Sequence, residues 1–319
     1  LIVSGAIDRI RPRAHEIGKA YRINDAAGRY IEFAKNSFPK RLTLRGLKIV
    51  VDCAHGAAYR VSPTVLRELG AEVVALNVTP DGLNINAGCG SLYPEVVQQA
   101  VLAEKAHVGI THDGDGDRLL CVDERGSLVD GDQILALCAL DMLAEGRLPG
   151  RTVVATVMSN VGLEVAMREA GITVVRTPVG DRYVLEEMLR GGYALGGEQS
   201  GHVIFADHNT TGDGIVTALQ VLAAMLRAGK PLSELAACMR RFPQVLENVR
   251  VRRREDLVTL PKVQAQIRAA EGALTGVGRV LVRYSGTEPL ARVMVEGPDE
   301  ATIRHWAGEI AAAIQEALG

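Results

Sequence analysis

The sequence predicts an α/β protein in which two related three-layer α/β domains precede a smaller α+β C-terminal domain. Short runs rich in Val and Ile alternate with segments whose apolar residues recur at helical spacing, as in strand–helix–strand units. That alternation occurs twice, and after Pro243 it gives way to a strand-rich region with two helices. The length of 319 residues is enough for two or three domains, each with its own core.

The boundaries of these units follow from where the pattern changes. We expect residues 24–127 and 128–242 to form the two α/β domains, and residues 243–319 to form the α+β domain. Residues 1–23 have weak periodicity and several charges, and the chain begins at Leu1 rather than at methionine. We therefore interpret residues 1–23 as the remnant of, or the linker from, a first domain that is missing from this chain.

The first unit opens with a β-branched run, LKIVVDC, which predicts a buried strand over residues 47–53. A helix is expected next, with Ser62 as its N-cap, Pro63 at its first position and Gly70 just past its end. The same criteria predict strands at 71–77 and 107–113 and a helix at 93–106.

The second and third units are predicted in the same way. The second unit has helical patterns at 134–146, 161–171, 181–192 and 214–229, and strands at 152–158, 172–179, 193–197 and 202–206. The third has strands at 245–251, 278–284 and 290–297 and helices around 261–271 and 299–318. The likeness of the first two units indicates a duplicated architecture.

Composition excludes several classes of function. A formal net charge of −2 gives no electrostatic reason to expect nucleic acid or an anionic membrane as a partner. No apolar run reaches the length of about 18 residues that a membrane helix needs. The 5 cysteines are scattered and never spaced as CxxC, which is typical of buried free thiols in a reducing compartment. We expect a cytoplasmic protein.

The clearest candidate site is an acidic loop, THDGDGDR, that follows the strand at 107–113. Asp113, Asp115 and Asp117 alternate with glycine, so on an extended backbone their carboxylates point the same way. Their mutual repulsion would cost several kcal/mol at an effective dielectric constant of about 20. A hard divalent cation removes that cost, and an all-oxygen ligand set suits Mg²⁺ best, with Ca²⁺ or Mn²⁺ as alternatives.

Two other interpretations of this loop compete. With Glu124 the aspartates match the ligand spacing of a calcium-binding EF-hand, but the glycine that its sixth position needs is Arg118 here, and strands flank the loop instead of helices. The other interpretation is a solvated hairpin turn. Three aspartates directly after a buried strand make that interpretation less favourable than a metal loop. Arg118 could pair with one of these carboxylates or face a phosphate that arrives at the metal.

A second candidate is the loop RYSGTEP, which joins two predicted strands. Arg283, Ser285 and Thr287 alternate, and Gly286 exposes its backbone N–H. Together they offer the guanidinium, hydroxyl and amide donors that a dianionic phosphate requires, and Arg292 on the next strand could add a second cation. A polar hairpin stabilised by its Ser and Thr side chains is the structural alternative.

A third candidate is the loop GGEQSGH between two short strands. Glu198 and Ser200 share a face, and a carboxylate beside a hydroxyl is suited to binding sugar hydroxyls. His202 could transfer a proton near neutral pH. Standing alone, this loop would be read as a tight turn with a surface histidine.

The three loops together resemble those of the α-D-phosphohexomutase superfamily. THDGDGDR is similar to the family's metal loop, GGEQSGH to its sugar-binding loop and RYSGTEP to its phosphate-binding loop. Gln199 agrees with the branch that acts on glucosamine phosphate. Other stretches resemble the same branch: AAGRYIEF, VDCAHGAAY, VDGDQI, VGDRYVLE and TTGDGIVTALQVLAAM. The resemblance runs from about residue 24 to the C-terminus.

This resemblance implies an intramolecular phosphotransferase of amino sugar metabolism with a four-domain fold. Such an isomerase interconverts glucosamine 6-phosphate and glucosamine 1-phosphate, for UDP-N-acetylglucosamine and peptidoglycan precursor synthesis. A phosphoserine donates its phosphoryl group to the sugar, and a bisphosphate intermediate returns the other one. The resemblance also implies a role for each candidate residue. Asp113, Asp115 and Asp117 would bind Mg²⁺, Glu198 and Ser200 would bind the sugar, and His202 and Arg118 would take part in catalysis. The residues that would bind the phosphate are Arg283, Ser285, Gly286, Thr287 and Arg292.

One feature of the family is absent from this sequence. The family's serine lies in a first-domain loop resembling TASHNP, and no stretch here resembles it; Ser37 and Ser62 lack its context. We therefore expect no mutase turnover by this chain alone. A sister enzyme acting on mannose or glucose phosphates, and a non-catalytic protein that binds sugar phosphates, are the alternatives. The expected partner is a small hexosamine phosphate, and the resemblance leaves a homodimer open as the assembly.

Overall fold

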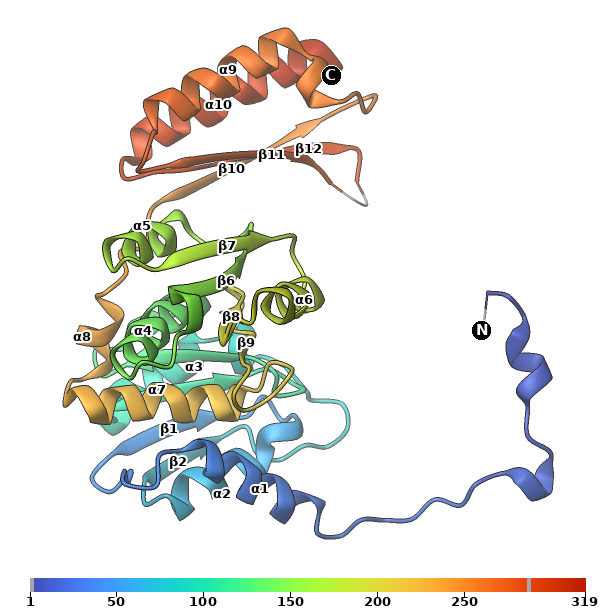
Figure 1. Ribbon diagram of the computed structural model, residues 1–319, viewed down its shortest axis with the longest axis vertical. Helices are drawn as coiled ribbons and strands as arrows, with labels where there is room; N and C mark the ends of the chain where they lie inside the picture. Colours follow the sequence, from blue (N-terminus) through green and yellow to red (C-terminus); the bar gives the residue numbers. More distant parts are fainter. Residues whose placement is uncertain (1–2, 286–287) are drawn as a thin grey trace.

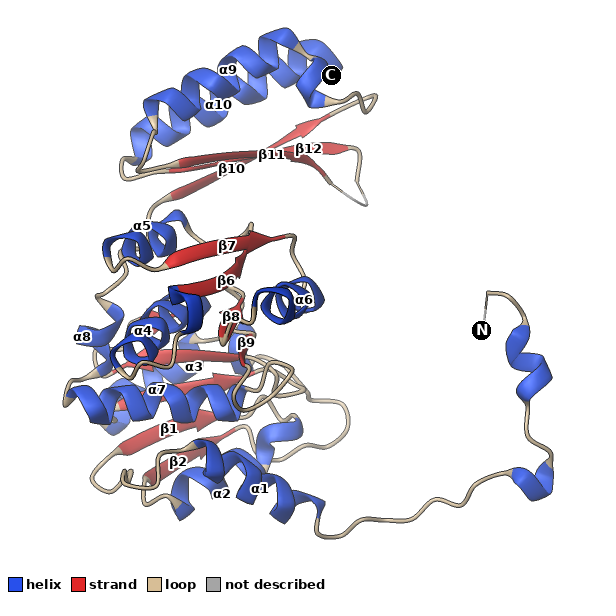
Figure 2. Ribbon diagram, viewed as in Figure 1, coloured by secondary structure: helices blue, strands red, loops and turns tan. Residues whose placement is uncertain are grey.

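The computed structural model describes residues 3–285 and 288–319 of the chain, and it contains three β-sheets. Figures 1 and 2 show the sheets following one another along the long axis of the molecule, each with helices beside it. The predicted fold class, two α/β domains followed by a smaller α+β domain, is confirmed.

The first sheet has the strand order β2-β1-β3-β4-β5. Its first three strands run parallel, whereas β4 and β5 are antiparallel additions. The strands are β1 (Lys48–Asp52), β2 (Glu72–Leu76), β3 (Val108–His112), β4 (Leu119–Asp123) and β5 (Leu128–Val129). The helices are α1 (Ala26–Ser37), α2 (Val61–Glu68) and α3 (Glu95–Glu104).

The second sheet repeats this plan with the order β7-β6-β8-β9. Again three strands are parallel and the last one, β9, is antiparallel to its neighbour. The strands are β6 (Thr152–Thr156), β7 (Thr173–Thr177), β8 (Leu195–Gly197) and β9 (Val203–Phe205). The helices are α4 (Gly131–Ala144), α5 (Val161–Glu169), α6 (Asp181–Gly191), α7 (Gly214–Ala228) and α8 (Leu232–Ala236). The matching order of strands bears out the duplicated architecture.

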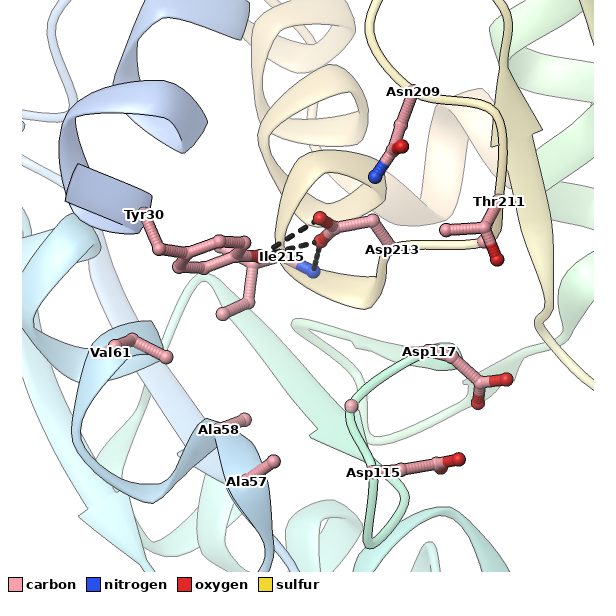
Figure 3. A pocket seen from close by; sticks show the side chains of 12 residues that line it. Tyr30, Ala57, Ala58, Val61, Asp115, Asp117, Asn209, Thr211, Asp213 and Ile215 are labelled. Carbon is pink, nitrogen blue, oxygen red and sulfur yellow. Dashed lines mark hydrogen bonds between the residues drawn. The ribbon is translucent and has the colours of Figure 1, made fainter. Parts of the chain in front are cut away.

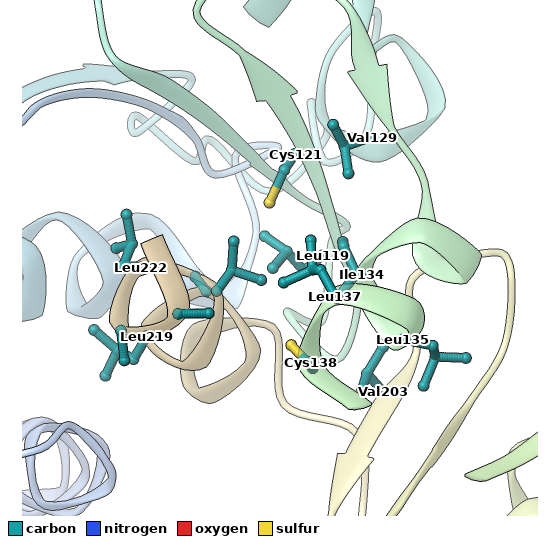
Figure 4. Packing of buried hydrophobic residues seen from close by; sticks show 14 of the residues in the cluster. Leu119, Cys121, Val129, Ile134, Leu135, Leu137, Cys138, Val203, Leu219 and Leu222 are labelled. Atoms are coloured by element: carbon teal, nitrogen blue, oxygen red, sulfur yellow. The ribbon is translucent and has the colours of Figure 1, made fainter. Parts of the chain in front are cut away.

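One hydrophobic core joins the two α/β domains. Helix α7 is buried along its first twelve residues, from Gly214 to Met225, and it packs against α4 of its own domain and α1 of the other. Figure 4 shows part of this buried cluster, with Leu219 and Leu222 of α7, Leu119 and Cys121 of β4, and Leu137 and Cys138 of α4. Because the buried cluster is continuous, the two domains form a single packed unit that holds the loops at their boundary in place.

The C-terminal domain has a core of its own, formed by an antiparallel sheet of order β10-β12-β11 and two helices on one face of it. Its strands are β10 (Gln244–Arg250), β11 (Arg279–Tyr284) and β12 (Leu290–Glu296). Its helices are α9 (Pro261–Ala273) and α10 (Glu300–Leu318), which pack against each other.

Buried polar groups attach this domain to the second α/β domain. Asn160 donates to the Phe242 carbonyl (3.0 Å) and to Oε1 of Glu296 (3.3 Å). Arg279 donates to Oε2 of Glu296 (3.0 Å) and to the Val157 carbonyl (2.8 Å). The attachment therefore depends on a paired charge, because the Glu296 side chain is fully buried.

Ser62 and helix α1 are places where the structure differs from the sequence prediction. The helix α2 begins at Val61, so Ser62 lies inside it and is not its N-cap, and the Ser62 hydroxyl lies 2.9 Å from Nε2 of the buried His112 instead. Helix α1 had no clear signal, since only Ala34 and Ser37 are buried along it.

The chain before α1 extends away from the three sheets (Figure 1). It includes two short 3₁₀ turns, Ala6–Ile10 and Ala14–Glu16, and exposes large apolar side chains. Within the described residues, no helix combines the length and apolar character needed to cross a membrane.

Candidate functional site

The acidic loop and the loop GGEQSGH (residues 196–202), called the sugar loop below after its predicted role, occupy equivalent places in the two α/β domains. The acidic loop joins β3 to β4, and the loop containing Glu198 joins β8 to β9, the corresponding strands of the second sheet. The two loops touch: Arg118 and His202 form an isolated antiparallel bridge, and the Leu119 N–H donates to the Gly201 carbonyl at 3.0 Å. The structure thus brings together two of the three motifs found in the sequence.

The three aspartates of the acidic loop converge. Asp113, Asp115 and Asp117 each offer one carboxylate oxygen, and these atoms lie within 4.8 Å of one another. Burial, with the negative charge of Asp117 adding to it, raises the pKa of Asp113 to about 7. Oδ1 of Asp117 is buried and accepts no hydrogen bond from any residue that the structure describes. Repelling carboxylates with an unused oxygen are the donor set that a hard divalent cation fits.

The Arg118 backbone N–H donates to Oδ1 of Asp113 at 3.1 Å, whereas its guanidinium makes no close contact with the cluster. Its Nε is 3.6 Å from Oδ2 of Asp113 and 3.8 Å from Oδ1 of Asp117, and 42% of its side chain is exposed. At these long distances, and with the guanidinium partly exposed, the ion pairs contribute little to stability. The guanidinium keeps donors for an anion beside the aspartates.

A cavity of about 340 Å³ opens beside the acidic loop (Figure 3). Ala58 and Val61 line one side, and Asp115 and Asp117 line the other. At the edge of the cavity, the Tyr30 hydroxyl donates to the Asp213 carboxylate at 2.8 Å (Figure 3). The cavity therefore combines an apolar wall with the face of the acidic cluster.

The sugar loop presents its carboxylate beside its hydroxyl, as the sequence predicts. The Ser200 hydroxyl donates to Oε2 of Glu198 at 3.3 Å, and the Gly180 N–H donates to Oε1 at 3.0 Å. Glu198, Gln199 and Ser200 line a cavity of about 260 Å³ with Thr156, Met158 and Val179. The Nε2 donor of Gln199 is buried without a partner in the described part of the chain. This cavity can accept a polyhydroxyl ligand.

His202 is buried, with only 4% of its surface exposed. Its Nδ1 lies 3.0 Å from Oδ2 of Asp117, and its Nε2 accepts a hydrogen bond from the Gly212 N–H at 3.0 Å. Both ring nitrogens are thus occupied by protein groups, one of them from the acidic loop.

The loop RYSGTEP (residues 283–289), called the phosphate loop below after its predicted role, joins β11 to β12. Gly286 and Thr287 fall outside the described residues. Arg283 and Arg292 face each other across the two strands, and like charges directly opposite are unfavourable unless an anion lies nearby. Arg292 pairs with Glu288 at 2.9 Å, yet its Nε is buried without a partner among the residues described.

Ser285 is 3% exposed, and its hydroxyl accepts from the Glu288 N–H at 3.3 Å, as in a hairpin that its own serine stabilises. The guanidinium of Arg254 holds the turn from the other side by donating to the carbonyls of Ser285 and Glu288 at 2.7 and 2.9 Å. In Figure 1 the described ends of β11 and β12 next to this turn lie on the same side of the molecule as the loop between β7 and α6.

Sequence reasoning missed two residues at the edge of the site, Tyr30 and Asp213. Asp213 caps α7 by accepting from the N–H groups of Ile215 and Val216. An Asp-Gly pair before a long apolar run is an N-cap signal, so Asp213 could have been found. Tyr30 could not, because its partner lies 183 residues away.

Family models match nearly the whole chain. Residues 28–126 match phosphoglucomutase/phosphomannomutase alpha/beta/alpha domain II, residues 130–242 match alpha/beta/alpha domain III, and residues 246–313 match the C-terminal domain of the same family. The three candidate loops fall one in each matched range.

Curated relatives agree with these models. The chain is 61% identical to the phosphoglucosamine mutase of Syntrophotalea carbinolica and 60% identical to that of Geobacter metallireducens, each over 319 residues. Those alignments cover all of this chain and 70% and 71% of the relatives, respectively.

Solved structures share the fold. A Burkholderia thailandensis phosphoglucomutase/phosphomannomutase family protein, 26% identical, aligns with a TM-score of 0.76 over 93% of this chain and 66% of its own. The Aspergillus fumigatus N-acetylphosphoglucosamine mutase in complex with GlcNAc-6P and magnesium, 24% identical, aligns with a TM-score of 0.69 over 90% of this chain and 70% of its own.

Proposed function

The chain belongs to the phosphoglucomutase/phosphomannomutase family as a homologue of the phosphoglucosamine mutases, and from that premise we propose that it carries the metal-, sugar- and phosphate-binding parts of a glucosamine-phosphate mutase. The observation that carries the proposal is the direct contact between the acidic loop and the sugar loop. A mutase needs this contact, because the phosphoryl group must pass between a metal-bound donor and a sugar hydroxyl held beside it.

The proposed reaction interconverts glucosamine 6-phosphate and glucosamine 1-phosphate. A phosphoserine P–O bond breaks as the phosphoryl group passes to one sugar hydroxyl, which gives the bisphosphate, and the hydroxyl's proton ends on the released serine oxygen. After that sugar turns round, its other phosphoryl group returns to the serine. The product would feed UDP-N-acetylglucosamine synthesis. The serine is not part of this chain's matched domains, so it has to come from a further domain.

The residues of the acidic loop are proposed to hold Mg²⁺. Asp113, Asp115 and Asp117 supply the oxygen ligands, and the bound ion would neutralise charge on the transferred phosphoryl group. Arg118, beside them, keeps its guanidinium available to a phosphate oxygen.

The substrate is proposed to lie between the sugar loop and the phosphate loop. Glu198 and Ser200 would accept from and donate to sugar hydroxyls, and the pair can do so for either orientation of the ring. Arg283 and Arg292, opposite each other on β11 and β12, would bind the phosphate that is not reacting, together with the turn from Ser285 to Thr287. This arrangement holds one phosphate while the other faces the acidic loop.

Enzyme assays test the proposal. The chain is joined to the first domain of the Syntrophotalea carbinolica relative, and conversion of glucosamine 6-phosphate is followed with Mg²⁺ present. We expect conversion by the joined protein, none by the 319-residue chain alone, and a large loss in the joined Glu198→Gln variant. Faster conversion of glucose or mannose phosphates would assign a sister activity. Binding of glucosamine 6-phosphate without conversion by the joined protein would favour a non-catalytic binding protein.

A further inference from the structure

The hydrogen bonds of His202 determine where its proton lies. A backbone N–H can only donate, so the Gly212 N–H at 3.0 Å requires a lone pair on Nε2. In the neutral ring the proton is then on Nδ1, from which it donates to Oδ2 of Asp117 at 3.0 Å. Neither nitrogen can take a substrate proton without breaking one of these bonds.

This donation fixes the orientation of the Asp117 carboxylate. Oδ2 is occupied by the imidazole, whereas Oδ1 is buried and accepts no hydrogen bond within the described residues. The free oxygen is therefore the one that can join Asp113 and Asp115 in binding a cation. A histidine that donates to a ligating carboxylate sets the position of that ligand, and such outer partners strongly affect metal affinity.

The backbone of the second α/β domain holds the ring in place. A Cβ added at Gly212 would lie 2.5 Å from Cε1 and Nε2 of His202. Glycine at this position therefore allows the backbone to approach the imidazole closely. Next to it, the Gly214 N–H donates to the Gly116 carbonyl at 2.9 Å, inside the acidic loop. Gly214 itself allows no larger side chain, because a Cβ there would lie 2.4 Å from the Arg118 carbonyl.

We propose that His202 is a positioning residue of the metal site: fixed by the Gly212 N–H, it orients Asp117 so that Oδ1 faces the cation. The second α/β domain thereby completes a cation site whose ligands all come from the first. The proposal rests on the proposed Mg²⁺ site and assigns His202 a role other than proton transfer.

The test uses the 319-residue chain and Mn²⁺, whose free form is counted by electron paramagnetic resonance. His202→Ala is expected to weaken Mn²⁺ binding about 10- to 100-fold. His202→Asn is expected to stay within about 3-fold of the wild type, because its amide can donate from the place of Nδ1. His305→Ala, an exposed histidine on α10, is the matched control and should bind as the wild type does.

Gly212→Ala tests the same claim without changing the imidazole. The added methyl group displaces the ring, so Mn²⁺ binding should weaken as in His202→Ala. Gly308→Ala on α10 is the control, since nothing lies within 4 Å of its added Cβ. The rise in unfolding temperature that Mn²⁺ produces should shrink in Gly212→Ala and not in Gly308→Ala.

The outcomes separate this proposal from the proposed function. Wild-type affinity in both His202→Ala and Gly212→Ala would overturn the positioning role while leaving the cation site standing. An equal loss of Mn²⁺ affinity in His202→Asn and His202→Ala would also overturn the positioning role. That role requires a hydrogen-bond donor at the place of Nδ1, which asparagine supplies, and does not require the imidazole ring. A wild-type chain that binds no Mn²⁺ would overturn both.

Discussion

Tyr30 and Asp213 join the two α/β domains at the rim of the site. The Tyr30 hydroxyl, on α1, donates to both carboxylate oxygens of Asp213 at 2.8 and 2.9 Å. Asp213 in turn caps α7 by accepting from two backbone N–H groups. Burial, with the Asp213 charge adding to it, raises the pKa of Tyr30, so this hydroxyl keeps its proton and remains a donor.

Tyr30→Phe should therefore destabilise the chain without removing apolar contacts. We expect a loss of about 1.5 kcal/mol in the free energy of unfolding, the range for a hydrogen bond to a charged group. Urea unfolding measures it. Tyr59→Phe is the control, because 39% of Tyr59 is exposed and its hydroxyl loses no comparable partner. Equal stability of the two variants would show that the Tyr30–Asp213 bond contributes nothing.

Asp113→Asn should change the metal-free and metal-bound proteins in opposite directions. Without a cation, removal of one repelling carboxylate should raise stability at pH 8 by about 1 kcal/mol, a figure reduced for solvent screening at this partly exposed loop. With Mg²⁺, the stabilisation seen in the wild type should disappear. Thermal unfolding with Mg²⁺ or with a chelator reports both effects, and a variant that Mg²⁺ still stabilises fully would exclude Asp113 as a ligand.

Asp132 should make stability depend on pH. Its burial raises its pKa to about 7, from an unfolded value near 3.8. Between about pH 4 and pH 7 the folded chain keeps a proton that the unfolded chain has lost, so this group's contribution falls as the pH rises through that window. Compared with Asp132→Asn, the wild type should lose about 3 kcal/mol of stability from pH 4 to pH 7, and the loss should level off about one pH unit above the folded pKa. Parallel pH profiles of the two proteins would contradict this assignment.

Removal of Arg279 should destabilise the chain mainly because it leaves the buried Glu296 carboxylate without its counter-charge. Burial is the main cause that lowers the pKa of Arg279 and raises that of Glu296, so burying this pair is costly despite a contact of 2.7 Å. Arg279→Ala leaves Glu296 unpaired, and we expect a loss of about 3 kcal/mol. The double variant Arg279→Met/Glu296→Leu should recover most of it.

Arg279 donates to the carbonyls of Val157 and Ser159, so hydrogen exchange of residues 157–159 shows whether the C-terminal domain has loosened in Arg279→Ala. Arg304→Ala, which removes an exposed helical pair with Glu300, is the control and should cost less than about 0.5 kcal/mol. If the double variant is as unstable as Arg279→Ala, a buried unpaired charge is not the cause.

The sequence predicted what depends on local pattern. Runs such as that of β1 (Lys48–Asp52) are β-branched and buried, and they marked the strands. The convergence of Asp113, Asp115 and Asp117 followed from their spacing alone. Helix α1 was not predicted, because few of its residues are buried. Ser62 was wrongly predicted to be an N-cap, because a cap residue and a first-turn residue look alike in sequence.

The link between His202 and Asp117 could not be predicted. The two residues are 85 positions apart, and the contact depends on how closely the backbones of the two domains approach at Gly201 and Gly214, and on Gly212, which lies against the imidazole within the second domain. A sequence shows that these glycines exist but not that Gly201 and Gly214 face residues of the other domain. The pairing of Arg283 with Arg292 likewise needed the strand register.

The most direct test is diffraction from crystals of the chain soaked in Mn²⁺ and glucosamine 6-phosphate, recorded near the manganese absorption edge. The account predicts one anomalous peak bounded by Asp113, Asp115 and Asp117, with Oδ1 of Asp117 toward the ion and the sugar against Glu198 and Ser200. An absent peak, or a sugar phosphate bound away from both loops, would contradict it.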